Sequence, residues 1–129
     1  MKIRLLPADV ALSKYVRLLS GGYCKRCWLL GKPGAYKGWK KLECAHYQGR
    51  RKRSTRWDLD NVLPLCFGCH SYIDGNRFAK SELFLEILGR EKFEALEKRA
   101  QETRQVSKEK EKEIARYYRE QNKILEVQE

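Results

Sequence analysis

The sequence lacks long apolar runs, and its first 20 residues lack the pattern of a secretory signal. No apolar stretch approaches the ~20 residues that a membrane span needs. The first 20 residues are charged throughout, unlike the apolar core of a signal peptide. We therefore expect a soluble, cytoplasmic protein with no membrane partner. Its 129 residues should form one modest domain with a small core, and we favour a monomer.

Acidic residues are nearly absent from the first half of the chain. Residues 1–57 carry 15 Lys and Arg against only Asp9 and Glu43, whereas residues 101–129 carry seven bases and seven acids. The formal net charge of +11 therefore arises before residue 58. Such an excess predicts a polyanionic partner, most commonly nucleic acid. A basic face that only aids solubility is the alternative, although such faces usually mix acids with their bases.

Five cysteines include two C-x-x-C pairs, CKRC and CFGC. In a reducing compartment such pairs indicate a metal or redox site rather than a disulfide. Because tetrahedral zinc takes four thiolates, we predict a structural Zn²⁺ site formed by Cys24, Cys27, Cys66 and Cys69. A thioredoxin-like redox pair is the alternative, but it leaves the second pair unexplained. Cys44 is expected to be buried in the core.

The N-terminal segment predicts one amphipathic helix. Asp9 is the expected N-cap of a helix over residues 10–20, which the pair Gly21-Gly22 ends. The expected apolar stripe comprises Val10, Tyr15, Leu18 and Leu19.

The segment with the histidines predicts a strand, a basic loop, a short second strand and a helix, in that order. The first strand is expected at residues 41–47, the loop at 48–55 and the helix at 68–74. From Ser81 onward, apolar residues three and four apart predict two helices separated at Gly89.

The C-terminal residues predict a charged extension. Residues 103–129 are expected to form a helix that is partly solvated or weakly docked. The domain that carries the function is therefore expected to span residues 1–102.

His46, Asn61 and His70 stand in the frame CAH…LDNVLPLCFGCH, nested between the two C-x-x-C pairs. This frame resembles the HNH endonucleases, whose ββα-metal finger is often braced by a four-cysteine zinc. The resemblance covers roughly residues 10–100, and the flanking RWDLDN is similar to phage-encoded members, including NinG-like recombination proteins. It implies an α+β fold: a small ββα-metal (HNH) finger held by the four-cysteine zinc and flanked by N- and C-terminal helices.

The resemblance also implies a divalent-metal-dependent endonuclease that nicks or cleaves duplex or branched DNA. His46 would be the general base that deprotonates the attacking water, since an imidazole titrates near neutral pH. Asn61 would fix the loop between the strands and orient His46 through its amide. His70 would coordinate a catalytic Mg²⁺ or Mn²⁺. The alternative is that one histidine is a spare zinc ligand or a core residue.

Ala45 departs from the family pattern. Many HNH enzymes place an acid or a second histidine there as a metal ligand. Asp74, four residues after His70 on the same helical face, is the expected replacement. Glu43, on the same side of the strand as Ala45, and Asp60 are the alternatives.

The basic run after His46 is expected to bind backbone phosphates without reading sequence. It comprises Arg50, Arg51, Lys52, Arg53 and Arg56. Trp39, Tyr47 and Trp57 could stack on nucleic acid, but as aromatics beside a small core they more often pack. A zinc-ribbon-like DNA-binding protein without catalysis is the alternative function, and Ala45 is the best argument for it.

Overall fold

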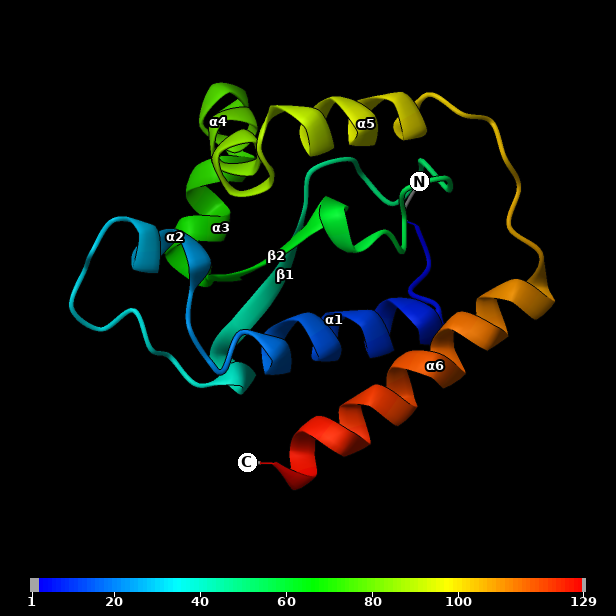
Figure 1. The fold of residues 1–129 in the computed structure, drawn as a ribbon, viewed down its shortest axis with the longest axis horizontal. Helices are drawn as coiled ribbons and strands as arrows, with labels where there is room; N and C mark the ends of the chain where they lie inside the picture. Colours follow the sequence, from blue (N-terminus) through cyan, green and yellow to red (C-terminus); the bar gives the residue numbers. More distant parts are fainter. Residues whose placement is uncertain (1–2, 129) are drawn as a thin grey trace.

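The computed structural model describes residues 3–128, which form an α+β fold around one two-stranded antiparallel sheet (Figure 1). The described helices are α1 (Pro7–Leu19), α2 (Lys25–Leu29), α3 (Phe67–Asp74), α4 (Arg77–Leu88), α5 (Arg90–Ala100) and α6 (Lys108–Val127). The strands are β1 (Leu42–His46) and β2 (Val62–Cys66). The hairpin lies between two groups of helices, with α1 and α6 on one side and α3, α4 and α5 on the other (Figure 1).

The two strands pair over all five residues, from Leu42 opposite Cys66 to His46 opposite Val62. One end of the hairpin therefore adjoins the cysteine pairs, and the other carries His46 and the connecting loop, residues 47–61. Successive side chains of a strand point to opposite faces. Consequently Cys44 packs toward α1, whereas the buried Ala45 packs toward α3.

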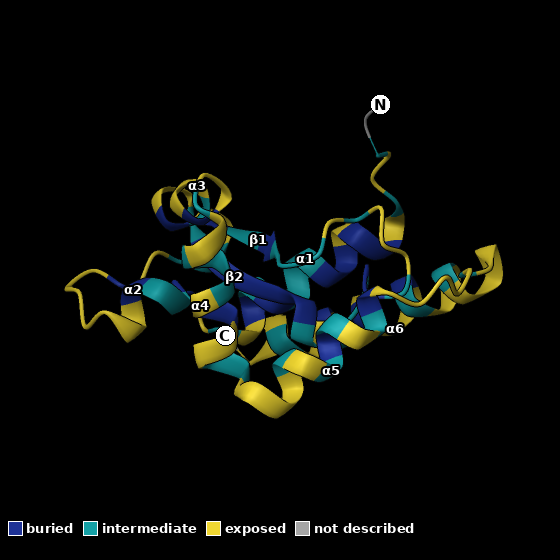
Figure 2. Cartoon of the chain, turned by 90° about the horizontal axis from the view of Figure 1, so that it is seen from above, coloured by how far each residue is buried: buried dark blue, intermediate teal, exposed yellow. Residues whose placement is uncertain are grey.

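Each face of the hairpin has its own small core. Buried residues gather at the centre of the molecule and exposed ones at its periphery (Figure 2). The face toward α3 and α4 buries a cluster that includes Leu63, Leu65, Ile73, Leu83 and Phe84. The opposite face buries a second cluster formed by Ala11, Leu12, Val16, Val62 and Tyr118. The sheet is thus covered on both sides, which fixes the direction of its side chains.

Helix α1 begins earlier than the sequence predicts. Pro7 is its first residue, a position that suits the fixed φ of proline. Asp9 is therefore not the N-cap: it lies within the first turn, where its carboxylate accepts a hydrogen bond from the Leu6 N–H at 2.8 Å. The expected stripe is also partly wrong, because Val10 and Leu19 are exposed. The buried residues of the helix are Ala8, Asp9, Ala11, Leu12, Val16 and Leu18.

Helix α6 lies along α1 and runs in the same direction, rather than docking weakly as expected (Figure 1). A carboxylate oxygen of Glu111 accepts a hydrogen bond from the Ala8 N–H at 3.0 Å. Further along, the Asn122 side chain donates to the Ala11 carbonyl at 3.1 Å, and Tyr118 is buried between the helices. The sequence did not predict this interface, because the apolar residues of α6 are few and are separated by charged residues.

Most other elements agree with the sequence patterns, but α4 begins at Arg77, before the expected Ser81, and the short helix α2 was not predicted. Helix α3 begins one residue before the predicted start, and α4 and α5 are separated at Gly89, whose φ of 85° favours glycine. Among the described residues, no helix is both long and apolar enough to cross a membrane.

Candidate metal centre and histidine site

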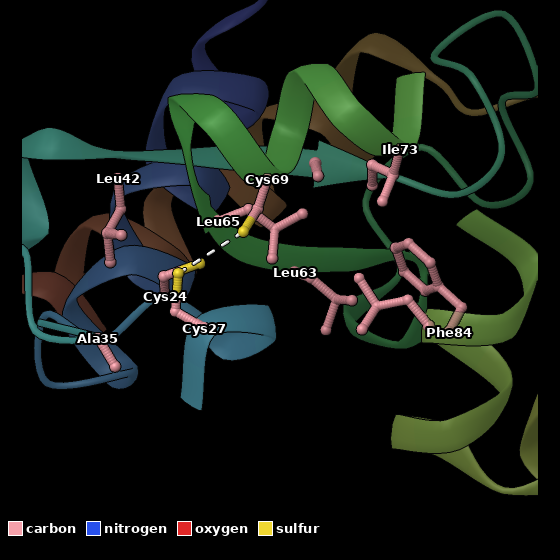
Figure 3. Packing of buried hydrophobic residues seen from close by; sticks show 11 residues of the cluster. Cys24, Cys27, Ala35, Leu42, Leu63, Leu65, Cys69, Ile73 and Phe84 are labelled. Atoms are coloured by element: carbon pink, nitrogen blue, oxygen red, sulfur yellow. Dashed lines mark hydrogen bonds between the residues drawn. The ribbon is translucent and has the colours of Figure 1, made fainter. Parts of the chain in front are cut away.

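The two C-x-x-C pairs occupy equivalent positions on two short helices. Cys24 and Cys66 are the N-caps of α2 and α3, and Cys27 and Cys69 are the third residues of those helices. Figure 3 shows cysteine side chains from both elements pointing toward one another. All four Sγ atoms lie within 4.8 Å of one another, so the predicted cysteines form one cluster.

The geometry of this cluster fits a tetrahedral metal. The Sγ of Cys27 lies 3.6 Å from that of Cys69 and 3.9 Å from that of Cys66. These separations exceed a disulfide bond of about 2.05 Å. They match the sulfur–sulfur separation of about 3.8 Å that a tetrahedral zinc with four thiolate ligands imposes. The four cysteines can therefore hold a structural metal such as zinc.

The surroundings of the cluster favour ionised sulfur at one ligand. Burial alone would raise the pKa of Cys66, but hydrogen bonds from the Cys69 N–H and neighbouring thiols lower it to about 7. Burial raises the pKa of Cys27 to about 12. The guanidinium of Arg26 lies 3.5 Å from the Cys69 sulfur, where its positive charge stabilises a thiolate.

His70 follows the last of these cysteines, and its ring lies between two carboxylates. Its Nδ1 is 2.8 Å from a carboxylate oxygen of Glu43 on β1. Its Nε2 is 3.3 Å from an oxygen of Asp74, one helical turn further along α3. Asp74 also pairs with Lys80, at 3.6 Å. Asp74 is exposed and Glu43 is half-buried, so this group opens to solvent.

The arrangement around His70 can present a cation-binding pair. A carboxylate that accepts the Nδ1–H fixes the tautomer, so that the Nε2 lone pair faces Asp74. Two ligands on one small divalent cation lie about 3 Å apart, close to the observed separation of Nε2 and the Asp74 oxygen. Glu43 and Asp74 contact opposite nitrogens of the ring, so one cation would bind two of these three groups. Within residues 3–128, only the four cysteines form a preformed cluster of three or more such ligands.

The three acids considered as replacements for the ligand missing at Ala45 lie in two different places. Asp74 and Glu43 both contact His70. Asp60 instead lies near α5, where its carboxylate is 3.3 Å from the Arg99 guanidinium. That ion pair assigns Asp60 to the support of the loop and removes it from the candidates.

His46 ends β1 in surroundings of the opposite charge. Burial, together with the charges of Arg50, Lys80 and His70, lowers the pKa of its imidazole from 6.5 to about 4, and Asp9 acts in the opposite direction. His46 is therefore uncharged at neutral pH, and a pKa this low makes it a weaker proton acceptor than the near-neutral imidazole expected of a general base.

Asn61 is fully buried and fixes the connecting loop. Its Oδ1 accepts a hydrogen bond from the Gln48 N–H at 2.7 Å, and its Nδ2 donates to the carbonyls of Gln48 and Thr55 at 2.9 and 3.1 Å. Both amide hydrogens are therefore used within the loop. Asn61 therefore holds the backbone at Gln48, two residues after His46, and its amide bonds do not go to His46 as was expected.

The basic run divides into an exposed part and a buried part. Arg51, Lys52 and Arg53 are exposed, and Arg50 is half-buried. Together with residues of the N-terminal segment, the arginines line a hollow of about 390 Å³. This part of the run is accessible to a polyanion.

The prediction that Arg56 binds backbone phosphates is wrong, because only 3% of its side chain is exposed. Its guanidinium forms two bonds to the Asp9 carboxylate, at 3.0 and 2.6 Å, and donates to the Arg4 carbonyl at 2.8 Å. Burial alone would raise the pKa of Asp9, but the bonds from Arg56, Leu6 and Trp57 hold it below its usual value. Arg56 therefore anchors the loop to α1. Asp9 is the one acidic residue before Glu43. An isolated acid among many bases was the one sequence signal that Asp9 would form a specific ion pair.

The aromatic residues near the basic run have different surroundings. Tyr47 packs against Phe84 and Phe93, and the Trp57 indole N–H donates to the Asp9 carboxylate at 2.9 Å. Both are packing residues. Trp39 lies nearer the surface, where the cationic ends of Lys14, Arg17 and Lys40 approach its ring.

Comparison of the chain with protein-family models, with curated proteins and with solved structures gives no significant match. The class of protein must therefore be inferred from the arrangement of its own residues.

Proposed function

We propose that the protein is an HNH-type endonuclease that hydrolyses DNA phosphodiester bonds with the help of a divalent cation. One observation supports this most strongly: the helix that follows a hairpin ending in His46 carries His70, whose ring contacts Glu43 of the hairpin and Asp74 of the helix. The hairpin and helix of the frame would thus supply a candidate base and a candidate cation site.

The four cysteines would bind zinc in a structural role. Cys24 and Cys27 belong to α2, whereas Cys66 and Cys69 join the end of β2 to α3. Metal binding would therefore hold α3 at a fixed position on the hairpin, and with it the ring of His70 against β1. Four thiolate ligands in a closed tetrahedral site are typical of structural zinc.

The proposed chemistry divides between the two histidines. His46 would accept a proton from the water that attacks phosphorus. The Nε2 of His70 and the Asp74 carboxylate would hold a Mg²⁺ or Mn²⁺, while Glu43 keeps the Nδ1–H in place. Such a cation supplies stabilisation of the charge that develops on the phosphate and the leaving oxygen. The half-buried Arg50 and the exposed residues 51–53 would bind the DNA backbone.

Supercoiled plasmid provides the test of this proposal. Purified protein should convert it to nicked circles with added Mg²⁺ or Mn²⁺, and much more slowly without. His46→Ala should lower the rate about 10²–10⁴-fold, because a positioned base is lost, while zinc content, melting temperature and gel-shift affinity stay close to wild type. Nicking by His46→Ala at the wild-type rate would exclude this mechanism.

The second candidate is a zinc-ribbon-like DNA-binding protein without catalysis. Ala45 favours it, because this residue is fully buried under α3 and offers no ligand where many HNH enzymes have one. Binding of plasmid without cleavage, at every concentration of Mg²⁺ and Mn²⁺ tested, would support this candidate over the first.

A further inference from the structure

The segment between the first C-x-x-C pair and β1 projects from the body of the protein and is largely exposed (Figures 1 and 2). Trp28 is 59% exposed and Tyr36 is 60% exposed. Tyr23 joins them, with its ring centroid 5.2 Å from each and its plane at steep angles to both. The three rings, together with Lys32 and two glycines, line a hollow of about 440 Å³.

These rings are held in place although they contribute little to either core. Tyr23 and Tyr36 form an isolated β-bridge, and the adjacent Cys24 N–H donates to the Ala35 carbonyl at 2.9 Å. Gly22 packs directly beneath Tyr36, since a Cβ at this position would lie 2.8 Å from the ring. The backbone next to the four-cysteine cluster therefore preorganises an exposed aromatic surface. Preorganisation of this kind reduces the entropic cost of binding a ligand.

The charge around the rings selects the kind of ligand. Residues 10–42 contain no acidic residue and eight basic ones: Lys14, Arg17, Lys25, Arg26, Lys32, Lys37, Lys40 and Lys41. An aromatic cage for a cationic ligand is therefore disfavoured, because the surrounding positive charge repels such a ligand. The same charge attracts a polyanion. Exposed rings beside basic residues are the combination that binds single-stranded nucleic acid, in which bases stack and phosphates pair.

The aromatic surface continues toward β1. Tyr36 also lines a second hollow, of about 640 Å³, whose walls include Lys37, Trp39, Lys40 and Lys41. A strand that stacks a base near Trp28 can thus continue along further basic and aromatic side chains. Bases in a duplex are already stacked on one another, so this surface suits unpaired nucleotides.

We propose that residues 23–41 bind an unpaired strand of nucleic acid, with bases stacked on Trp28 and Tyr36 and phosphates bound by the neighbouring lysines. This binding does not depend on the proposed cleavage. It requires no divalent cation and neither histidine. A failure of the plasmid assay would therefore leave it intact, and a failure of this inference would leave the proposed nuclease intact.

Fluorescence anisotropy tests the inference with the zinc-loaded full chain and no added divalent cation. The probes are a labelled oligothymidylate of about 15 nucleotides and a mixed-sequence duplex of equal length, because one OB-sized site covers about 4–16 nucleotides. Trp28→Ala/Tyr36→Ala should weaken binding of the single strand by about 5- to 150-fold for each of the two stacked bases that is lost. Affinity for the duplex should change less than about two-fold.

Two further variants keep the test interpretable. Phe78→Ala/Tyr117→Ala removes exposed rings from α4 and α6, and should leave both affinities unchanged. Trp28→Phe/Tyr36→Phe keeps a stacking face and should restore single-strand affinity to within a few-fold of wild type. The inference is wrong if the alanine pair weakens both probes equally, which would indicate general electrostatics. It is also wrong if single-strand affinity is unchanged, which would assign the surface to another partner such as an acidic peptide.

Discussion

The two histidines of this chain occupy opposite electrostatic surroundings, although the same hairpin and helix carry them. His46 is influenced by Arg50 and Lys80, and burial with these charges lowers its pKa to about 4. His70 lies between the carboxylates of Glu43 and Asp74. An imidazole that accepts a proton must be neutral, whereas nearby carboxylates favour cation binding by an imidazole. The contrast therefore suggests a division of roles between the two imidazoles.

The strand period explains how the two surroundings arise so close together. Glu43 and Ala45 share the face of β1 toward α3, whereas Cys44 and His46 share the opposite face. Helix α3 supplies His70 and Asp74 on the first face, four residues apart on one side of the helix. The connecting loop, residues 47–61, supplies the positive charge near the second face. Variants that disrupt the scaffold shared by both histidines should have the largest effects on the contrast between their surroundings.

Removal of the metal cluster should abolish both histidine environments. Structural zinc contributes on the order of 10 kcal/mol to small metal-dependent domains, so Cys27→Ser should cause loss of bound zinc and a large fall in melting temperature. Cys44→Ala is the matched control, because Cys44 lies outside the cluster and its variant should retain one zinc per chain. Unchanged melting and zinc content in Cys27→Ser would contradict the four-cysteine assignment.

Loss of the buried ion pair should destabilise the loop next to His46. Arg56→Ala leaves the Asp9 carboxylate buried without its main partner, which typically costs about 3–5 kcal/mol. Urea denaturation should detect this loss. Arg53→Ala, an exposed position in the same run, should change the free energy of unfolding by less than about 0.5 kcal/mol. Equal stabilities of the two variants would show that the Asp9–Arg56 pair has no structural role.

Charge on the exposed part of the loop should affect DNA binding. Replacement of Arg51, Lys52 and Arg53 by Ala should reduce the salt slope of duplex binding by roughly one unit per lost phosphate contact, equally on unrelated sequences. The triple variant of Lys112, Arg116 and Lys123, exposed bases on α6, is the control and should keep the wild-type slope. If both triple variants behave alike, the loop does not bind phosphates.

The smallest effect is expected in the titration of His46. NMR should give a midpoint near 4, because burial and the nearby cations disfavour the charged imidazole. The unfolded chain, with a value near 6.5, then binds a proton first as the pH falls. His46 therefore contributes stability above pH 6.5 that is lost between pH 6.5 and 4. Arg50→Gln should raise the midpoint, whereas Arg90→Gln, an exposed change on α5, should not. A midpoint near 6.5 in the wild type would contradict the contrast.

Local patterns predicted much of the scaffold and of the candidate site. The C-x-x-C spacing identified all four cysteines of the cluster, and the strand predicted at residues 41–47 corresponds to β1. The helix predicted at residues 68–74 placed His70 next to the cluster, where Asp74 follows one turn later. These features depend on residues that are near in sequence or fixed by a common metal.

Features that depend on distant partners were not predictable in this way. Arg56 looked identical to its exposed neighbours, and only the fold reveals its contact with Asp9, 47 residues away. Glu43 was an alternative to Asp74, whereas the structure places both at His70. The packing of α6 on α1 is likewise set by long-range contacts, such as Asn122 with Ala11.

The division of roles between the histidines is tested most directly by cation titration of plasmid nicking in two variants. His46→Ala and His70→Ala are compared with wild type over increasing Mn²⁺. Both variants should be strongly impaired at low Mn²⁺. Excess Mn²⁺ should partly restore His70→Ala, because Asp74 still offers a ligand, and should leave His46→Ala inactive, because no cation replaces the proton acceptor. Rescue of His46→Ala by Mn²⁺, or wild-type nicking by either variant at low Mn²⁺, would contradict the account.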